Sequence, residues 1–496
     1  MESPSCLEPR WRLSGLLLAA VVLTAGCQQT GASLAESSLQ VPAHTAAHRV
    51  AAPPTESLDD RGVVRLVSAE ADVGSVVADP DRPLETLELL AADDNPTLRR
   101  MRQETAGAWS RTRYVGRLPD AALGSRFFIP PMNFEPDRQV ADVELMQTIP
   151  WLARLDAEQK RACMEALALE NEYSAERLRV ISKVREQWFA FYALQKECEI
   201  IAAEREPIEL LVNSASDRVA TGDAQPNDVL MAALELSSLQ EREWTARRQL
   251  VATVAELNRL AGRPADTQIK PPQTIAPATT IADPPALFAL AVANQPAVQA
   301  ARLQSLATRW GIEIARLQRR PDLTLGVGWV AMDAVAGAPA GAGRDSFTLG
   351  VTTTLPINRR KYGAMLSEAT QMHAAAHATE DEVLQQLDAT IQSLYEQIES
   401  VRRTVRLYEQ EILPQARQAF DANQQALATG AATYDRVLRD YRTLLNFQLG
   451  YHRSLAQLAS GLAQLQQTVG LDGPHSDFES PDEAGPAETL PGIQAD

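Results

Sequence analysis

The most constraining feature of this chain is an internal duplication with an offset of about 208 residues. Short landmarks of the first half recur in the same order in the second half, and their offset drifts only from 200 to 208 residues. A period this long lies outside the range of solenoid repeats, so each copy is a unit of about half the protein. The matched landmarks are Asn95-Pro96 with Gln295-Pro296, Pro119-Asp120 with Pro321-Asp322, Ile149-Pro150 with Leu355-Pro356, Pro207 with Pro414, Ala220-Thr221-Gly222 with Ala428-Thr429-Gly430, and Gly262 with Gly470.

Each copy is predicted to form a helix, two strands, a very long helix, a turn and a returning helix. The strands are expected at 123–129 and 140–149, and again at 323–330 and 347–355, with a Gly/Ala loop at 331–343. In the second pair, apolar residues alternate with small or polar ones. This alternation is typical of a membrane β-barrel wall. A soluble antiparallel hairpin with one wet face alternates in the same way, so the strands alone leave both possibilities open.

The long helices separate these possibilities. Residues 151–221 contain no strong helix breaker except Pro207, and residues 359–429 none except Pro414. We expect a kink at each proline. About 70 residues at ~1.5 Å each span roughly 105 Å, more than a globular domain needs. Leu, Val and Ala at three- and four-residue spacing supply seams for coiled-coil-like packing. One chain cannot bury both sides of such rods, whereas several chains side by side can.

The N-terminus has the pattern of a targeting segment. Two arginines precede an apolar run at 13–23, which is too short to span a bilayer as a stable helix. The run ends in Leu23-Thr24-Ala25-Gly26-Cys27, which resembles a bacterial lipobox. Cleavage there would make Cys27 a lipidated N-terminus, and Gln28 after it is consistent with export to the outer membrane. The alternative is an ordinary secretory cleavage site with an incidental cysteine.

Charge and composition exclude several classes of function. The net charge of −17 argues against nucleic-acid binding, which needs a basic face. The sequence has no Cys/His cluster with the spacing of a zinc site. His373 and His377 share a helix face at i, i+4 and could bind a metal, but a pair facing solvent or a neighbour is the more common arrangement.

These patterns divide the chain into six parts. We expect the two repeats at 84–265 and 284–470, joined by a linker at 266–283. The other segments are a lipoprotein signal peptide at 1–26, a flexible tether at 27–83 and a disordered acidic tail at 471–496.

The order and spacing of the landmarks resemble those of the outer membrane factor (TolC) family over about residues 84–470. The marks are Asn95-Pro96, Leu118-Pro119-Asp120, Ile149-Pro150-Trp151, Thr221-Gly222 before Asp228-Val229-Leu230, and Leu257-Asn258-Arg259-Leu260-Ala261-Gly262.

The resemblance implies a mainly α-helical fold with a small transmembrane β part. Three chains would contribute four strands each to a 12-stranded outer-membrane barrel, which a periplasmic α-helical barrel continues. The resemblance implies that such a homotrimer is a passive exit duct without catalysis and without a bound cofactor, and that it meets a periplasmic adaptor protein and an inner-membrane pump. The implied system is tripartite efflux or type I secretion, in a Gram-negative-type outer membrane. Pro150 and Pro356 then mark the joints between barrel and helical tube, because proline neither continues a helix nor donates to a strand ladder.

The resemblance also directs attention to the two Thr-Gly turns, which would form the periplasmic end where the channel closes and partners dock. Well-known members carry acidic residues six and nine positions after the second glycine, but here those positions hold arginines. We therefore hypothesise a gate held by arginine–aspartate contacts; the alternative is a solvated charged helix face. The residues of this hypothesis are Gly222, Asp228, Gly430, Asp435, Arg436 and Arg439.

Two other classes of protein compete with the channel. A lipidated periplasmic adaptor also has a long helical hairpin, but it has one hairpin flanked by β-rich domains rather than a repeated unit. A structural coiled-coil lipoprotein would not need the alternating strands at 323–330 and 347–355.

Overall fold

The computed structural model describes residues 56–58, 64–66, 83–128, 137–222, 225–276, 281–334 and 342–471. The chain divides into two units, Met1–Val77 and Ala78–Asp496. In the first unit, strands β1 (Glu56–Leu58) and β2 (Val64–Leu66) form an antiparallel pair within the segment expected to be a tether. The predicted signal peptide, Cys27 and the tail beyond residue 471 lie outside the described residues.

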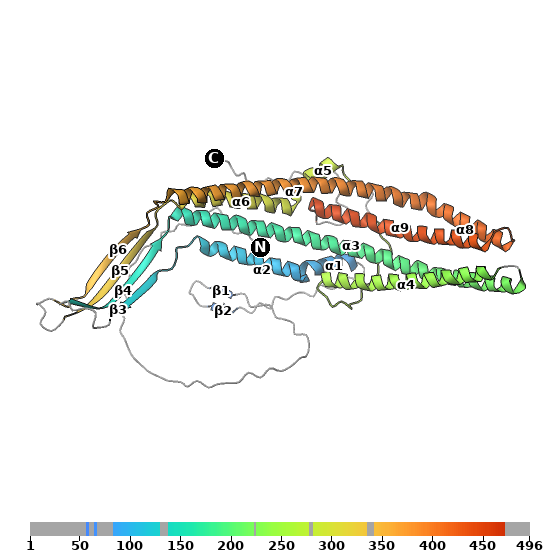
Figure 1. Cartoon of the computed structure of the whole chain (residues 1–496), viewed down its shortest axis with the longest axis horizontal. Helices are drawn as coiled ribbons and strands as arrows, with labels where there is room; N and C mark the ends of the chain where they lie inside the picture. Colours follow the sequence, from blue (N-terminus) through green and yellow to red (C-terminus); the bar gives the residue numbers. More distant parts are fainter. Residues whose placement is uncertain are drawn as a thin grey trace, which may run out of the picture. The chain divides into compact units, whose positions relative to one another are not determined.

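The second unit contains the duplication, and its element order confirms the predicted one (Figure 1). The first copy consists of α1 (Pro83–Asp94), α2 (Pro96–Val115), β3 (Ala122–Phe127), β4 (Asp137–Ile149), α3 (Leu152–Thr221) and α4 (Pro226–Leu260). The second consists of α5 (Pro284–Asn294), α6 (Pro296–Leu317), β5 (Leu323–Ala334), β6 (Ser346–Thr353), α7 (Arg359–Leu407), the π-helical turn η1 (Tyr408–Ile412), α8 (Leu413–Ala428) and α9 (Tyr434–Val469).

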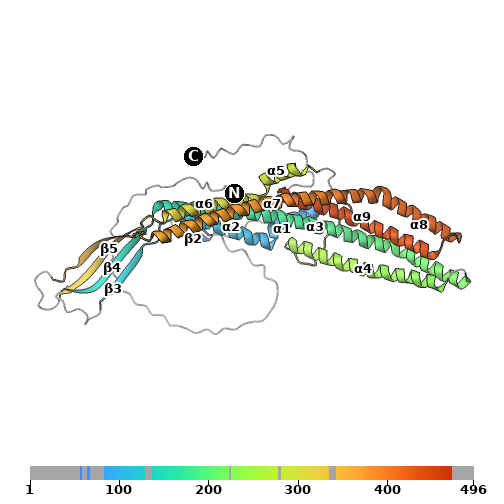
Figure 2. The same ribbon diagram turned by 45° about the horizontal axis from the view of Figure 1, so that its top comes forward.

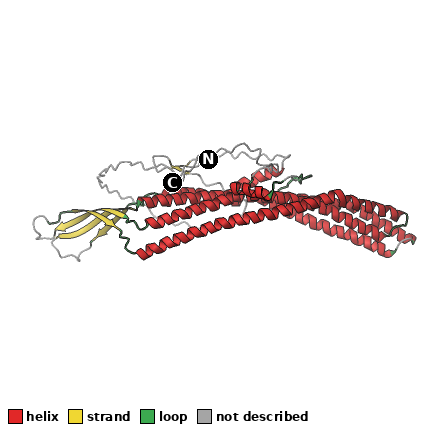
Figure 3. Cartoon of the chain, turned by 90° about the horizontal axis from the view of Figure 1, so that it is seen from above, coloured by secondary structure: helices red, strands yellow, loops and turns green. Residues whose placement is uncertain are grey.

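The four strands of this unit gather at one end, and the two helical turns lie at the opposite end (Figure 1 and Figure 3). The strands form one antiparallel sheet in the order β3-β4-β5-β6. The helices that adjoin them, α2, α3, α6 and α7, contact one another in the same order. Farther from the sheet, α4 packs on α3 and α9 on α8 (Figure 2).

Two strands are longer than the sequence predicted. β4 begins at Asp137 and β5 continues to Ala334, into the segment expected to be a loop. The two extensions pair with each other, with Asp137 opposite Ala334, and the register shifts between Gln139 and Ala141. A β-bulge of this kind absorbs an extra residue and lets pairing continue, which alternation alone does not reveal.

The prolines expected at the joints lie between a strand and a helix, whereas the two prolines inside the long helices differ from each other. Pro150 separates β4 from α3, and Pro356 separates β6 from α7. α3 runs through Pro207 without interruption, but the helix of the second copy changes to a π-helical turn immediately before Leu413-Pro414. A proline ring clashes with the carbonyl four residues earlier, and a π-turn moves that carbonyl away.

Three apolar clusters hold the helices together. The first joins α1, α3, the end of α4 and α9, and the aromatic side chains between residues 188 and 192 are buried in it. The second joins α5, α7 and α9, and the third joins α3, α4, α8 and α9 near the turns. Among the described helices, none combines the length and hydropathy needed to cross a membrane.

The duplication extends to individual contacts. The buried Asn95 amide donates to the Leu260 carbonyl at 3.0 Å, and the buried Gln295 amide donates to the equivalent Thr468 carbonyl at 2.9 Å. Gly262 and Gly470 both have a positive φ, and a Cβ on either would lie within 3.0 Å of the backbone just before that amide residue. The same short-helix end is therefore fastened to the same returning helix in both copies.

Candidate functional site

The strand registers set apolar residues of one strand beside apolar residues of the next, so the sheet has one apolar face and one polar face. Leu145 stands beside Val327, and Val327 beside Leu349, so large apolar side chains form rows across the sheet. These side chains are exposed, with Phe347 and Leu349 each 80% exposed. The opposite face carries Gly, Thr and the Arg126–Asp142 ion pair at 2.6 Å. An exposed apolar face on a sheet this small is suited to contact with lipid.

Both edges of the sheet are unpaired in the described chain. β3 and β6 each have one neighbour, so the outward N–H and C=O groups of each strand lack a ladder partner. An exposed edge is a template for pairing with another chain. The apolar face and the open edges together make this sheet incomplete as a single chain.

The joint between sheet and helices is held by a contact between the two copies. The Arg154 guanidinium lies 3.0 Å from an Asp322 carboxylate oxygen, and the other oxygen of Asp322 accepts the Trp151 backbone N–H at 3.1 Å. Arg320 lies over the Trp151 ring. Pro-Asp and Pro-Trp are recognisable landmarks in the sequence, but their pairing is not predictable from it, because nothing in the sequence places α3 beside β5.

At the opposite end, Gly222 and Gly430 have φ values of 84° and 75°, which confirms the left-handed turns. Asp228 is the third residue of α4, and its carboxylate accepts the Gln225 backbone N–H at 3.2 Å in a capping box. Arg439 forms an exposed ion pair with Asp435 one turn earlier in α9. Arg436 is exposed and forms no ion pair within the described part of the chain. The single chain therefore brings together Asp435 and Arg439 but not Asp228 with either arginine.

Above the turns, the two helical hairpins are tied to each other by buried polar groups. The Tyr434 hydroxyl of α9 donates to the Leu211 carbonyl of α3, and burial raises the pKa of Tyr434 to about 12, so it remains a donor. Arg442 of α9 pairs with Glu235 of α4, which is 4% exposed. These contacts fix the spacing between the α3–α4 hairpin and the α8–α9 hairpin within one chain. They join residues more than 200 positions apart, so the sequence alone does not predict them.

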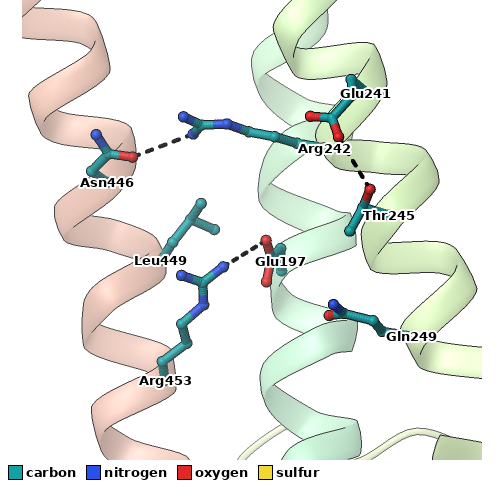
Figure 4. Close-up of a pocket in the computed structure, with 8 residues that line it drawn as sticks. All are labelled: Glu197, Glu241, Arg242, Thr245, Gln249, Asn446, Leu449 and Arg453. Atoms are coloured by element: carbon teal, nitrogen blue, oxygen red, sulfur yellow. Dashed lines mark hydrogen bonds and ion pairs between the residues drawn. The ribbon is translucent and has the colours of Figure 1, made fainter.

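Farther from the turns lies a polar groove of about 330 Å³ between α3, α4 and α9 (Figure 4). Arg453 pairs across the groove with Glu197 at 2.7 Å, and Arg242 donates across it to the Asn446 side-chain oxygen at 3.3 Å, whereas Glu241 accepts from Thr245 of its own helix. The groove is lined by Glu197, Glu241, Arg242, Thr245, Gln249, Asn446, Leu449 and Arg453.

The two histidines of α7 contact each other and neighbouring polar side chains. The rings of His373 and His377 lie 4.7 Å apart, His373 Nδ1 is 3.0 Å from the Thr308 hydroxyl, and His377 lies 3.6 Å from Glu380. Within the described residues, no group of three or more His, Cys, Asp or Glu side chains has the geometry to hold a metal ion.

Comparisons with known proteins agree with this geometry. Residues 287–471 match the family model described as outer membrane efflux protein. The chain is 25% identical over 292 residues to the cobalt-zinc-cadmium resistance protein CzcC of Cupriavidus metallidurans, covering 58% of this chain and 67% of that protein.

Solved structures with the same fold include the outer membrane protein VceC of Vibrio cholerae, with a TM-score of 0.66, 20% identity, and 78% of this chain and 96% of that one covered. The CmeC outer membrane channel of Campylobacter jejuni aligns with a TM-score of 0.68 and 14% identity over 79% of this chain and 87% of that one. With the family match and the curated relative, these likenesses favour the channel over the adaptor and the structural lipoprotein. Residues 287–471 therefore carry an outer membrane efflux protein domain, and the chain as a whole is similar to outer membrane efflux channels.

Proposed function

We propose that three copies of this chain form the outer-membrane duct of a tripartite efflux system. The duct receives substrate from an inner-membrane pump through a periplasmic adaptor, and a lipid on Cys27 adds an anchor in the same membrane. The open edges of the β3–β6 sheet carry this proposal. Each unpaired backbone group costs several kcal/mol in lipid, so four strands with an apolar outer face need closure by other copies.

The helices support the same assembly. α4 contacts mainly α3, and its other side exposes a stripe of large apolar residues. Each of these side chains is more than 60% exposed, at positions spaced like a coiled-coil seam. Packing against another copy would bury the stripe, which consists of Leu230, Leu234, Trp244 and Val251.

The experiment is fractionation of the membranes followed by mass determination and planar-bilayer conductance of the purified protein. We expect a trimer in the outer-membrane fraction with discrete conductance steps. A monomer without conductance would refute the proposal. The Cys27→Ala variant, labelled with radioactive palmitate, tests the anchor separately: we expect it to lose the label, and retention of the label would show that the lipid is elsewhere.

The gate is proposed at the end formed by the two turns. Of the two arginines in the proposed gate, Arg436 has no acidic partner in the described chain, and Asp228 occupies the equivalent position of the other turn. We expect the Arg436→Ala/Arg439→Ala double variant to raise single-channel conductance, because it removes the cations of the proposed contacts. Unchanged conductance would contradict the gate. Lys361→Ala, at the distant sheet end of α7, is the matched control.

A narrower proposal concerns the substrate. The relative in Cupriavidus metallidurans is named for resistance to cobalt, zinc and cadmium, and its similarity covers more than half of this chain. We propose divalent metal cations as the substrate class. Deletion of the gene should sensitise cells to these three cations, and normal metal tolerance together with a gain in sensitivity to organic drugs would contradict the proposal.

A further inference from the structure

In the duplication, β3 corresponds to β5 and β4 corresponds to β6, each with a constant difference in residue number. Asp322 follows Asp120 by 202 residues, and Leu355 follows Ile149 by 206 residues. Ala122 of β3 lies opposite Met146 of β4. Adding 202 to the first number and 206 to the second gives the pair Thr324–Thr352. This is the observed register of β5 and β6. The offsets therefore carry pairing registers from one copy to the other without a shift.

Contacts also run from the first copy to the second, through β4 and β5 and through Arg154 and Asp322. Their counterparts from the second copy to the first would join β6 to β3 and Arg360 to Asp120. These cannot form within one chain, because β3 and β6 occupy opposite edges of the sheet. Arg360 and Asp120 are both exposed, and neither forms an ion pair within the described part of the chain.

We propose that β6 pairs with β3 of the partner subunit in the register that the two offsets dictate. Gly326 lies opposite Met146 in the observed pair of β4 and β5. The equivalent contact places Thr352 opposite Gly124 of the partner subunit. The same transformation pairs Arg360 with Asp120 of the partner subunit, as a copy of Arg154–Asp322. This inference rests on the proposed assembly and specifies its contacts residue by residue.

The chemistry of the two edges agrees with this register. It sets Leu349 opposite Phe127 of the partner subunit on the apolar face. It also sets Gly350 opposite Arg126 of the partner subunit on the polar face, where glycine leaves room for the long side chain. A slip by one residue would turn every apolar side chain of one strand to the wrong face. The proposed register therefore continues the apolar rows of the sheet across the subunit boundary.

The test uses paired cysteines in the full-length protein. A Cβ on Gly124 would approach only the Glu144 carbonyl, at 3.8 Å, so a cysteine fits there. The Thr352→Cys/Gly124→Cys variant should form covalent trimers on a non-reducing gel. The matched control is Gly350→Cys/Gly124→Cys, two residues out of register, where a Cβ on Gly350 is equally unobstructed. Diagonal neighbours stand about 7–8 Å apart, so the control should cross-link roughly tenfold less.

The outcomes separate the register from the assembly. Cross-linking of the control in preference to the Thr352 pair would overturn the register. An intact trimer, established by native mass, in which the Thr352 pair does not cross-link would overturn it as well. A monomeric protein would overturn the proposed function together with the inference.

A charge exchange tests the ion pair independently. Asp120→Arg should lower the fraction of detergent-resistant trimer roughly fivefold, because it places like charges opposite each other at three boundaries. The Asp120→Arg/Arg360→Asp variant should restore the fraction, because every subunit then carries the exchanged pair. If the double variant is no better than Asp120→Arg alone, the two residues do not meet.

Discussion

A buried ion pair in the first copy has an apolar counterpart in the second, and this difference yields a quantitative prediction. The Arg185 guanidinium donates to both Glu88 carboxylate oxygens, at 2.7 and 3.2 Å, and to the Gln466 side-chain oxygen at 2.8 Å. The equivalent positions in the second copy are Ile391 and Phe288, which lie in its apolar cluster. Equivalent positions of the two copies therefore hold an ion pair in one copy and an apolar contact in the other.

We expect Arg185→Ile to destabilise the protein by about 3 kcal/mol. Breaking a buried pair costs ~3–5 kcal/mol because a charge is left without a partner, and Glu88 keeps 19% of its side chain exposed, which favours the lower end. In the Glu88→Phe/Arg185→Ile variant no charge remains. Only the Gln466 oxygen loses its donor, at a cost of ~1–3 kcal/mol that the added apolar burial partly offsets. The double variant should thus be more stable than Arg185→Ile.

The measurement is equilibrium unfolding in urea of the purified protein in detergent, at one protein concentration for all variants because assembly adds to apparent stability. Trp188 lies one helical turn from Arg185 in the same core and reports the transition by fluorescence. The reasoning is refuted if Arg185→Ile stays within ~1 kcal/mol of the native protein, or if the double variant is the less stable of the two.

Three other expectations follow from single sites. Gly262→Ala should lower the free energy of unfolding by ~1–3 kcal/mol more than Gly222→Ala. Both glycines have a positive φ, but of the two only Gly262 would bring a Cβ against the backbone, 2.6 Å from the Asp94 carbonyl oxygen. Equal thermal midpoints of the two variants would contradict this. Burial lowers the pKa of His452, so the unfolded state binds more protons below pH ~6.5. Stability should fall as the pH drops through that range toward the folded-state pKa, and His452→Gln should flatten the pH dependence of the unfolding free energy; an unchanged slope would exclude the effect. Asn95→Ala should cost ~1–3 kcal/mol in urea unfolding, because it removes the α2 cap and leaves the Leu260 carbonyl without its donor, and a loss below ~0.5 kcal/mol would contradict that role.

The element order was predictable because its signals are local. Proline at the first position of α2 and α6, the prolines that separate strand from helix, and glycines with positive φ all act through backbone geometry that their own sequence fixes. The alternation in β5 and β6 predicted the faces of the sheet for the same reason. None of these signals depends on which segment lies beside another.

The features that were missed depend on that placement. Arg185 and Glu88 are 97 residues apart, and only the packing of α1 on α3 shows that the two charges neutralise each other. Arg154 and Asp322 meet through the sheet in the same way. The π-turn before Pro414 has no equivalent at Pro207, although the two prolines match in the duplication, so tertiary packing decides how each helix accommodates its ring.

The unequal turns have a consequence for an assembly of three chains. If the copies alternate around a ring, each turn that carries Asp228 has turns that carry Arg436 on both sides. Two identical copies would instead set like charges side by side at all six boundaries. An exposed pair of opposite charges stabilises a contact by ~0.2–1 kcal/mol, whereas a pair of like charges destabilises it by a similar amount. The three boundaries within the chains lack this contact in the structure, so only the three boundaries between chains can supply it, and these act together only while the ring is closed. In the proposed trimer, the exchange of Asp for Arg between equivalent positions would therefore favour closure at the end where the proposed gate lies, and it would leave the matched contacts of the helical wall unchanged.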